Sequence, residues 1–358
     1  MNYMENVSKE IKEYFNILEP NYPEWLNEYI NTKTMQKQRY ISVNCGKTYS
    51  KMHNDEKSYN SLDHSIGVAL IIWHFTHNKK QTLSGLFHDI ATPVFKHSID
   101  FMNGDYMTQE STEDLTSILI KNSDEIMSLL KRDGIELSEV DDYHKYSIAD
   151  NNTPQLSSDR LEYSLSNGHF VYNDISLEDI KELYNDLEIQ KDEKCRDEIA
   201  FKTKELAEKF VERTSYYSIK YRDAKTRYSM QLIADIVKIM NQQGLLTKKD
   251  LYTLKESEVV DLIKKCKYND IGKKYELWQN SSEINISKEE PKDVYYVHHG
   301  AKVRYIDPLC NGTRISDISK KAKEDIQNNL NYDMNDYMYL DFELFQNKDK
   351  NANRGDER

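Results

Sequence analysis

The chain has 358 residues, of which 38% are apolar and 31% charged, and this length suits one large domain or a core with an appended lobe, because single cores stop growing at roughly 250 to 300 residues. Its formal net charge of −12 opposes binding to nucleic-acid backbones, no stretch approaches the ~20 consecutive apolar residues of a membrane helix, and its first ten residues lack the pattern of a secretory signal. The four cysteines are scattered without a CxxC pair, which favours reduced thiols, so we expect a cytoplasmic protein that acts on a small molecule.

Apolar residues recur at three- and four-residue spacing, and only 11 glycines and 6 prolines interrupt the chain, so the pattern predicts a mainly α fold. Residues 61–78 are apolar on most faces and predict a buried central helix. Residues 82–92 predict a second helix that ends at Pro93, which lacks the backbone donor of a helix interior. Further helical patterns cover residues 112–131, 157–166, 176–190 and 193–244.

The residue composition changes near residue 290. VYYVHHGAKVRYIDPL and DYMYLDFELF are rich in Val, Ile, Tyr and Phe with partial alternation, which is typical of strands. We therefore expect a helical core over residues 1–275, a small α+β lobe over 290–345 and a disordered tail over 346–358.

Four ionisable residues stand among apolar neighbours in the predicted helices: His64, His88, Asp89 and Asp159. Burying such groups without partners costs roughly 2 to 7 kcal/mol for a polar group and more for a charge, so they need hydrogen bonds or a cation. Core histidines bonded to backbone carbonyls are one solution. The other is a shell of two imidazoles and two carboxylates around one divalent cation, which suits Mn, Fe, Co, Ni, Zn or Mg.

The joint pattern resembles a known family. LDHSIGVA, GLFHDIATPVFKHSID and SSDRLEY, with a signature region over 60–165, are similar to the H…HD…D motif of HD-domain metal-dependent phosphohydrolases. Within that superfamily they most resemble the deoxynucleoside triphosphate triphosphohydrolase branch, which includes bacterial dGTPases and the human SAM-and-HD-domain protein. The resemblance extends from QRYISVNCG through ERTSYYSIKYRDAKTRYSM to KVRYIDPL, about residues 35 to 345.

The resemblance implies an HD-domain helical core with His64, His88, Asp89 and Asp159 as ligands of a single metal. It also implies that His97 and Asp100 form a catalytic pair near the scissile phosphate, since a carboxylate three residues from an imidazole can orient it for proton transfer. Arg160 matches a basic position that reaches substrate phosphates, and Tyr163 matches an aromatic near the sugar.

The chain departs from the family pattern at substrate-facing positions. Thr92 and Gln109 stand where relatives usually have histidines, Ser61 replaces an arginine, and Asn167 replaces an acid that touches the sugar. The metal ligands are therefore retained while contacts to the triphosphate and sugar differ, so the activity of this branch cannot simply be transferred.

The segment YYSIKYRDAKTRY offers two further substrate-binding residues, Tyr221 and Arg222. The guanidinium of an arginine presents a planar fork of donors that matches phosphate oxygens. A solvated helix face explains the same segment equally well. His298 and His299 lie far from the signature, and we expect them at the surface.

These observations predict a hydrolase that cleaves a phosphate ester or anhydride, of a nucleotide or deoxynucleotide, with a metal-activated water. One alternative is a phosphomonoesterase or phosphodiesterase that acts on another phosphorylated metabolite. A second is a non-catalytic nucleotide-sensing module in which the metal is structural. The expected partner is a small phosphorylated substrate, without nucleic acid or membrane, and relatives in this branch often form homo-oligomers.

Overall fold

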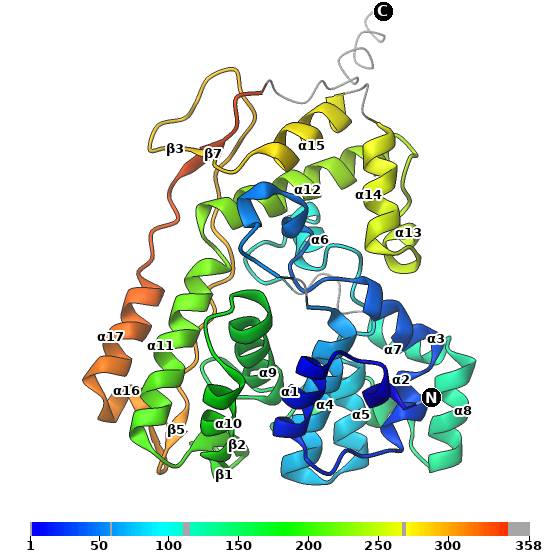
Figure 1. Cartoon of the computed structure of the whole chain (residues 1–358), viewed down its shortest axis with the longest axis vertical. Helices are drawn as coiled ribbons and strands as arrows, with labels where there is room; N and C mark the ends of the chain where they lie inside the picture. The colour runs from blue at the N-terminus through cyan, green and yellow to red at the C-terminus, as the bar shows by residue number, and fades with distance from the viewer. Residues whose placement is uncertain (1, 58, 110–114, 267–269, 343–358) are drawn as a thin grey trace, which may run out of the picture.

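A computed structural model describes residues 2–57, 59–109, 115–266 and 270–342 of the chain. Helices dominate these residues, which confirms the mainly α fold (Figure 1). The tail predicted over 346–358 lies outside them. Helices in the lower part of Figure 1 include α1 (Lys9–Leu18), α2 (Leu26–Ile30), α3 (Lys33–Gln36), α4 (Ser61–Thr76), α5 (Lys79–Phe87), α7 (Thr116–Lys121), α8 (Asp124–Asp133), α9 (Ser158–Ser166) and α10 (Leu177–Asn185).

Helix α4 is the predicted central helix. The Asn60 side chain caps it by accepting a hydrogen bond from the Asp63 amide at 2.9 Å, which satisfies one of the donors that a helix start leaves free. All residues from Ser61 to Ile72 are buried, as expected of a helix that is apolar on every face. Helix α4 packs against α1, α5 and α9, and so brings the chain segments of the HD-like signature together.

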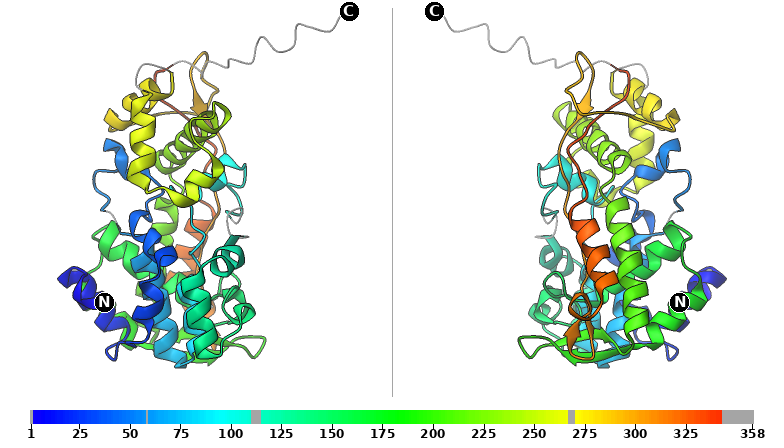
Figure 2. Two further views of the ribbon diagram at one scale, coloured as in Figure 1. Left: turned by 90° about the vertical axis from the view of Figure 1, so that its right-hand side faces the viewer. Right: turned by 90° about the vertical axis from the view of Figure 1, so that its left-hand side faces the viewer.

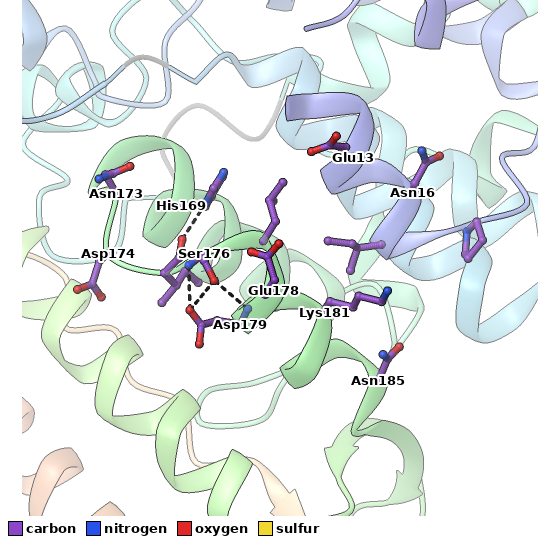
Figure 3. A pocket seen from close by; sticks show the side chains of 14 residues that line it. Glu13, Asn16, His169, Asn173, Asp174, Ser176, Glu178, Asp179, Lys181 and Asn185 are labelled. Atoms are coloured by element: carbon purple, nitrogen blue, oxygen red, sulfur yellow. Dashed lines mark hydrogen bonds between the residues drawn. The ribbon is translucent and has the colours of Figure 1, made fainter. Parts of the chain in front are cut away.

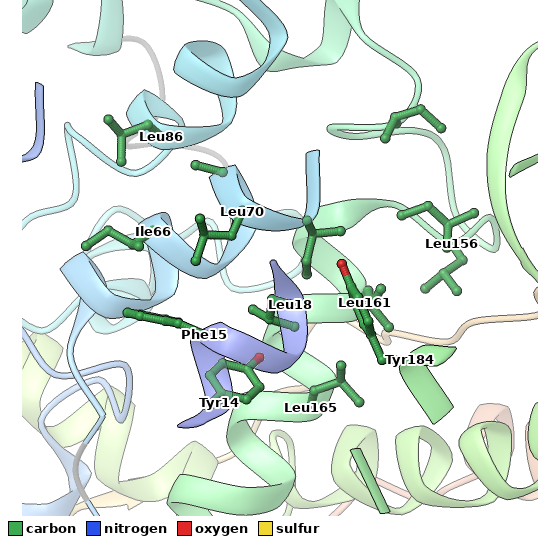
Figure 4. Close-up of a cluster of buried hydrophobic side chains, with 14 of the residues drawn as sticks. Tyr14, Phe15, Leu18, Ile66, Leu70, Leu86, Leu156, Leu161, Leu165 and Tyr184 are labelled. Carbon is green, nitrogen blue, oxygen red and sulfur yellow. The ribbon is translucent and has the colours of Figure 1, made fainter. Parts of the chain in front are cut away.

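The lower core is formed mostly by side chains of these helices. Figure 4 shows Phe15 of α1 beside Ile66 and Leu70 of α4, with Leu161 and Leu165 of α9 completing the cluster. These side chains are at most 1% exposed, and each buried side chain of this size contributes roughly 1.5 to 3 kcal/mol. The packing fixes α4 and α9 relative to each other, which matters because both carry predicted metal ligands.

A second core lies in the upper part of Figure 1. Its long helix α12 contributes Tyr228, Leu232 and Ile236 to a cluster that also contains the fully buried Trp278. The helices around it are α6 (His97–Met102), α12 (Ala224–Gln242), α13 (Lys248–Thr253), α14 (Glu256–Lys265) and α15 (Asp270–Asn280). The three remaining α-helices are α11 (Lys204–Lys220), α16 (Ile315–Ile318) and α17 (Lys320–Leu330), and α11 and α17 lie side by side (Figure 2).

The helices expected over 176–190 and 193–244 were wrong in part. Residues 187–201 form an antiparallel hairpin, β1 (Leu187–Lys191) and β2 (Asp197–Phe201), paired in register from Leu187↔Phe201 to Lys191↔Asp197. A parallel pairing of Phe201 with Cys310 extends this sheet. The pairing with Cys310 is distant in sequence, so local apolar spacing could not reveal it.

The predicted helix over 112–131 is two helices, α7 and α8, because Ser123 caps a new start by accepting from the Ile126 amide. Residues 110–114 lie outside the described part. The helix predicted over 82–92 starts earlier and ends at Phe87. Pro93 follows only after a short turn, so the helix ends before the proline rather than at it.

The C-terminal strands lie in two sheets. In the first, the order is β1, β2, β5 (Leu309–Cys310), β6 (Thr313–Arg314), and in the second it is β3 (Asn285–Ser287), β7 (Tyr337–Tyr339), β4 (Tyr296–Val297). The first sheet includes the β1–β2 hairpin described above, and the second sheet packs on α12. The boundary between a core and a C-terminal lobe therefore stays a prediction. Among the described helices, none combines the length and hydropathy needed to cross a membrane.

Candidate metal centre and active site

The four predicted metal ligands converge from three helices. His64 lies in the first turn of α4, His88 and Asp89 directly follow α5, and Asp159 lies in the first turn of α9. The Ser157 side chain caps α9 by accepting from the Arg160 amide, which fixes the turn that carries Asp159. Packing of α4 against α5 and α9 therefore gathers residues that are far apart in sequence.

The Nε2 atoms of His64 and His88 lie near each other and near one carboxylate oxygen of each aspartate, and the two histidines with Asp89 form a group that could hold a cation. Nε2 of His64 is 3.1 Å from Nε2 of His88 and 3.2 Å from Oδ1 of Asp159. Nε2 of His88 is 3.6 Å from the same oxygen, and both Nε2 atoms are 3.8 Å from Oδ2 of Asp89. Donors about 2.1 Å from a shared metal stand roughly 3.0 to 3.5 Å apart when they are neighbours in the shell.

The other nitrogen of each imidazole is already bonded. Nδ1 of His88 donates to the Gly85 carbonyl at 2.7 Å, and Nδ1 of His64 donates to Oε2 of Glu162 at 2.5 Å. Each Nε2 therefore carries a lone pair in the neutral ring. Two lone pairs that face each other at 3.1 Å repel unless a positive charge lies between them. The alternative of core histidines bonded to backbone carbonyls therefore accounts for only one nitrogen, Nδ1 of His88. The facing Nε2 atoms and the two carboxylates fit a cation.

The pKa shifts in the cluster also favour a positive charge between the two histidines. Burial disfavours an imidazolium, but the carboxylates of Glu162 and Asp159 outweigh it and raise the pKa of His64 to about 10. For Asp89, burial favours the neutral acid, but Lys96 and the two histidines overcome it and hold the pKa well below its usual value. The raised pKa shows that the site favours a positive charge at His64, and a divalent metal would supply that charge in place of the proton on Nε2.

Glu162 is a buried carboxylate that the sequence analysis missed. Besides His64, its oxygens accept hydrogen bonds from the hydroxyls of Tyr14 and Tyr59, both at 3.2 Å, and of Ser166 at 3.1 Å. Four donors therefore hold a charge that is 0% exposed. Glu162 follows Asp159 by three positions, so both lie on the same face of α9, and this spacing was the available signal. Carboxylates of this kind orient a ligand histidine and raise its basicity.

Lys96 was also missed. Its ammonium lies 2.6 Å from Oδ2 of Asp89, and the residue is 9% exposed. Lys96 and the preceding Phe95 have positive φ angles, of 42° and 67°, which residues other than glycine rarely adopt. Nothing in the local sequence marks such a conformation, since neither residue is Gly, Asn or Asp.

His97 and Asp100 form the expected pair. Nδ1 of His97 lies 2.9 Å from Oδ2 of Asp100, which is fully buried behind it. Burial lowers the pKa of His97, helped by the nearby cations Arg304 and Lys96, against the opposing effect of Asp100. The imidazole is therefore neutral near pH 7 and can accept a proton through its other nitrogen.

The cluster opens into a cavity of about 420 Å³, a size that suits a small organic ligand. The cavity is lined by the four predicted metal ligands together with His97, Arg160, Tyr163 and Tyr221. Further cations on its wall, which the sequence analysis did not single out, are Lys47, Lys96, Lys302 and Arg304. Such a lining suits an anionic ligand in an otherwise acidic protein.

Arg160, Tyr163 and Tyr221 all line the cavity, and their role in substrate binding stays a prediction. NH1 of Arg160 contacts Oδ1 of Asn151 at 2.6 Å and Oδ1 of Asp150 at 3.2 Å. The rings of Tyr163 and Tyr221 are 6.3 Å apart in an edge-to-face arrangement, and the Asn167 amide donates to the Tyr221 hydroxyl at 3.0 Å. Helix α9 continues there into a π-helical turn, Asn167–Val171, a feature frequent at functional sites.

The structure places Arg222 away from the cavity. Its side chain is fully buried and donates to the backbone and side-chain oxygens of Asn329 at the end of α17. Consecutive residues in a helical turn point about 100° apart, so Tyr221 and Arg222 face different partners. Arg222 therefore links the turn after α11 to the end of α17, and it is not among the residues that line the cavity. His298 is exposed and stacks on Tyr337, while His299 is half-buried.

The departures from the family pattern have different surroundings. Gln109 lines the cavity and accepts a hydrogen bond from NH2 of Arg304 at 2.7 Å. Thr92 and Ser61 are buried outside the cavity lining. The pairing of Gln109 with Arg304 was not predictable, because the KVRY segment reaches this wall only through the tertiary fold.

A second, broader hollow of about 950 Å³ lies at the surface between α1 and α10 (Figure 3). Its carboxylates have other partners: Asp179 bonds Ser176 and Lys209, and Asp174 bonds Arg213. The acidic group of Asp192, Glu193 and Glu198 is likewise neutralised, by Arg196 and Arg314. Neither place offers imidazole donors facing one another.

Sequence comparisons find two similar bacterial proteins. No family model matches the chain. It is 24% identical to the uncharacterised protein YdhJ of Bacillus subtilis strain 168 over 270 residues, which cover 73% of this chain and 78% of YdhJ. It is 25% identical to the uncharacterised protein MG461 of Mycoplasma genitalium over 195 residues, 46% of this chain and 43% of that protein.

Two solved structures resemble the whole molecule. One is a phosphohydrolase of Bacteroides thetaiotaomicron, with a TM-score of 0.61 and 13% identity over 90% of this chain and 97% of that one. The other is a hypothetical protein of Aquifex aeolicus, with a TM-score of 0.61 and 15% identity over 89% and 93% of the two chains. At these identities the likeness concerns the fold, and the chain shares the fold of this phosphohydrolase.

Proposed function

We propose that the chain is a metal-dependent phosphohydrolase of the HD superfamily that hydrolyses a phosphate ester or anhydride of a nucleotide or deoxynucleotide. The observation that carries this proposal is the cluster of two imidazoles and two carboxylates in the wall of a cavity that is also lined by lysines and arginines. The fold shared with a phosphohydrolase supports it, as does the resemblance of the HD-like signature.

A divalent cation bound by His64, His88, Asp89 and Asp159 would polarise a phosphoryl oxygen and lower the pKa of a bound water. Glu162 holds the His64 ring with its Nε2 toward the cluster. His97, oriented by Asp100, accepts the proton that the attacking water releases.

The other residues of the cavity bind and orient the substrate. Arg160 and the lysines of the wall offset phosphate charge, and Arg160 can do so through two parallel hydrogen bonds. Tyr163 and Tyr221 offer apolar faces and hydroxyls to a sugar or base. The cavity volume of about 420 Å³ accommodates a nucleotide and excludes a folded macromolecule.

The test begins with elemental analysis of the purified protein and a phosphate-release screen on nucleotides with added divalent ions. We expect close to one metal per chain, and we expect the double variant His88→Ala, Asp89→Ala to lose both metal and activity. Glu193→Gln, in the arginine-neutralised acidic group, is the matched control and should keep both. A wild type that neither retains nor binds a divalent ion would refute the proposal.

Product analysis separates the alternatives. Release of inorganic tripolyphosphate from deoxynucleoside triphosphates supports the triphosphohydrolase activity of the resembling branch. Release of orthophosphate from monophosphates favours a phosphomonoesterase on another metabolite. Nucleotide binding in a thermal-shift titration without turnover favours a sensor, an alternative motivated by Thr92 and by the Gln109 amide, which Arg304 holds in the wall.

A further inference from the structure

One imidazole of the cavity has no part in the function described so far. His144 lies in the short 3-10 helix η7 (Tyr143–Lys145) and lines the same cavity as the metal ligands and His97. The neighbouring Tyr143 packs its ring on the ring of His88, with centroids 5.2 Å apart. The segment that carries His144 therefore lies directly against the metal centre.

The orientation of His144 is fixed by its own turn. Oδ1 of Asp142 accepts hydrogen bonds from the backbone N–H of His144 and from its Nδ1, both at 3.0 Å. Nδ1 thus carries a proton, and Nε2 lies 3.4 Å from Oδ2 of Asp150. The bond from Nδ1 to Asp142 resembles the bond of His97 to Asp100, so two imidazoles that are each held by a carboxylate line one cavity.

Asp150 links His144 to the phosphate-binding side. Its other oxygen lies 3.2 Å from NH1 of Arg160, which directly follows the ligand Asp159. A carboxylate here holds an imidazole and a guanidinium side by side. A substrate phosphate offers the same charge and the same acceptors, so it can engage both donors.

Two other histidines that are bonded to carboxylates differ from His144. His53 is bonded at both nitrogens inside the protein, to Glu56 and Ser229, and His74 pairs with Glu19 away from the cavity. The side chain of His144 is 54% exposed, so it can reach a ligand and exchange protons with solvent.

We propose that His144 is a second catalytic residue, which donates a proton to the leaving oxygen while His97 accepts one from the attacking water. This inference rests on the proposed phosphohydrolase function. The water oxygen forms the new P–O bond as its proton passes to His97. The bond from phosphorus to the leaving oxygen breaks as that oxygen takes the proton from Nε2 of His144. Exchange with solvent then resets both rings.

The test uses the full-length, metal-loaded protein with the best nucleotide substrate of the screen. His144→Ala and His144→Gln should each lower kcat by about 100-fold or more, a usual size for general acid catalysis, with KM changed less than about threefold. Glutamine keeps a hydrogen-bond donor but has no proton to transfer, so it separates proton donation from binding. His298→Ala, which removes an exposed histidine stacked on Tyr337, is the matched control and should keep the wild-type kcat.

Added imidazole should restore part of the activity of His144→Ala, since a lost proton donor can be replaced from solution. Metal content and melting temperature of the variants show whether the site is otherwise intact. If His144→Gln works as well as the wild type, or if only KM rises, His144 binds substrate and the catalytic assignment is wrong. If the wild type itself hydrolyses no nucleotide with any divalent ion, the proposed function fails, and this inference fails with it.

Discussion

Replacing Glu162 with glutamine should weaken metal binding while leaving the protein folded. The carboxylate accepts the Nδ1 proton of His64 at 2.5 Å and is completely buried. Glutamine has the same shape, can accept that proton through its own oxygen, and can donate its amide hydrogens to the hydroxyls of Tyr14 and Tyr59. The negative charge that makes His64 a stronger donor to a cation is what the variant loses.

The size of the effect follows from this geometry. Removing a partner of a ligand histidine costs 10- to 100-fold in metal affinity, or about 1.4 to 2.7 kcal/mol. Glu162→Ala differs, because four donors lose their acceptor, at roughly 1 to 3 kcal/mol for each buried group left unpaired. Such a loss is a large part of a total stability of roughly 5 to 15 kcal/mol, so the alanine variant should unfold readily and cannot replace the glutamine test.

Isothermal titration of the metal-stripped protein with Mn²⁺ or Zn²⁺ measures the affinity, and thermal melting of the same samples checks the fold. Glu19→Gln is the matched control, because Glu19 is also a buried carboxylate paired with an imidazole, that of His74, away from the cavity. Wild-type affinity in a folded Glu162→Gln protein would show that this carboxylate does not tune His64 for a metal.

Three further substitutions probe the same structure. Gly67→Ala would bring a Cβ within 2.6 Å of Oε1 of Glu162, and we expect melting curves to show a loss of roughly 1 to 3 kcal/mol and titrations to show weaker metal binding; wild-type values for both would contradict the close packing. Burial raises the pKa of Glu256 from its usual 4.5 to about 7, so the folded state holds the proton more tightly than the unfolded state and stability is lost as the pH rises through this window, by about 3 kcal/mol. Glu256→Gln lacks this loss, and its melting temperature should gain on the wild type between about pH 4.5 and 7; parallel pH profiles would refute the shift. Arg222→Ala should cost about 2 kcal/mol or more in unfolding experiments, since the buried hydrogen bonds to Asn329 disappear, while KM and kcat for the substrate stay at wild-type values; a raised KM would return Arg222 to the substrate site.

The helices that carry the proposed ligands were predictable because their signals are local. An apolar run around His64, a proline after His88-Asp89 and a serine cap before Asp159 are each visible within one turn or two of the chain. Glu162 follows from the same reasoning, since three positions along a helix return to the same face. Its role was missed because a charged residue in SSDRLEY also fits the exposed side of a helix.

The cavity wall that faces the proposed metal ligands was less predictable because it comes from irregular or distant segments. His144 lies in a single 3-10 turn, and Arg304 in an extended segment whose position depends on pairing and packing far along the chain. The link from the hairpin at 187–201 to Cys310 has the same cause, although the pairing of β1 with β2 is itself local. Periodicity reports which face of an element is buried and not what that face meets.

The loop between α5 and α6 shows why the substrate side departs from local rules. Positive φ angles at Phe95 and Lys96 cost roughly 1 to 2 kcal/mol each, and such conformations persist only where surrounding contacts determine them. Here the Leu251 carbonyl accepts from the Val94 amide at 2.8 Å, and the buried Glu256 accepts from Phe95. The strained turn sets the Lys96 ammonium against a proposed ligand and begins the helix of His97. Contacts from the second core hold this strained loop, and the loop places two basic side chains, those of Lys96 and His97, in one cavity. An unstrained loop could have packed as well, so function explains the strain better than packing does.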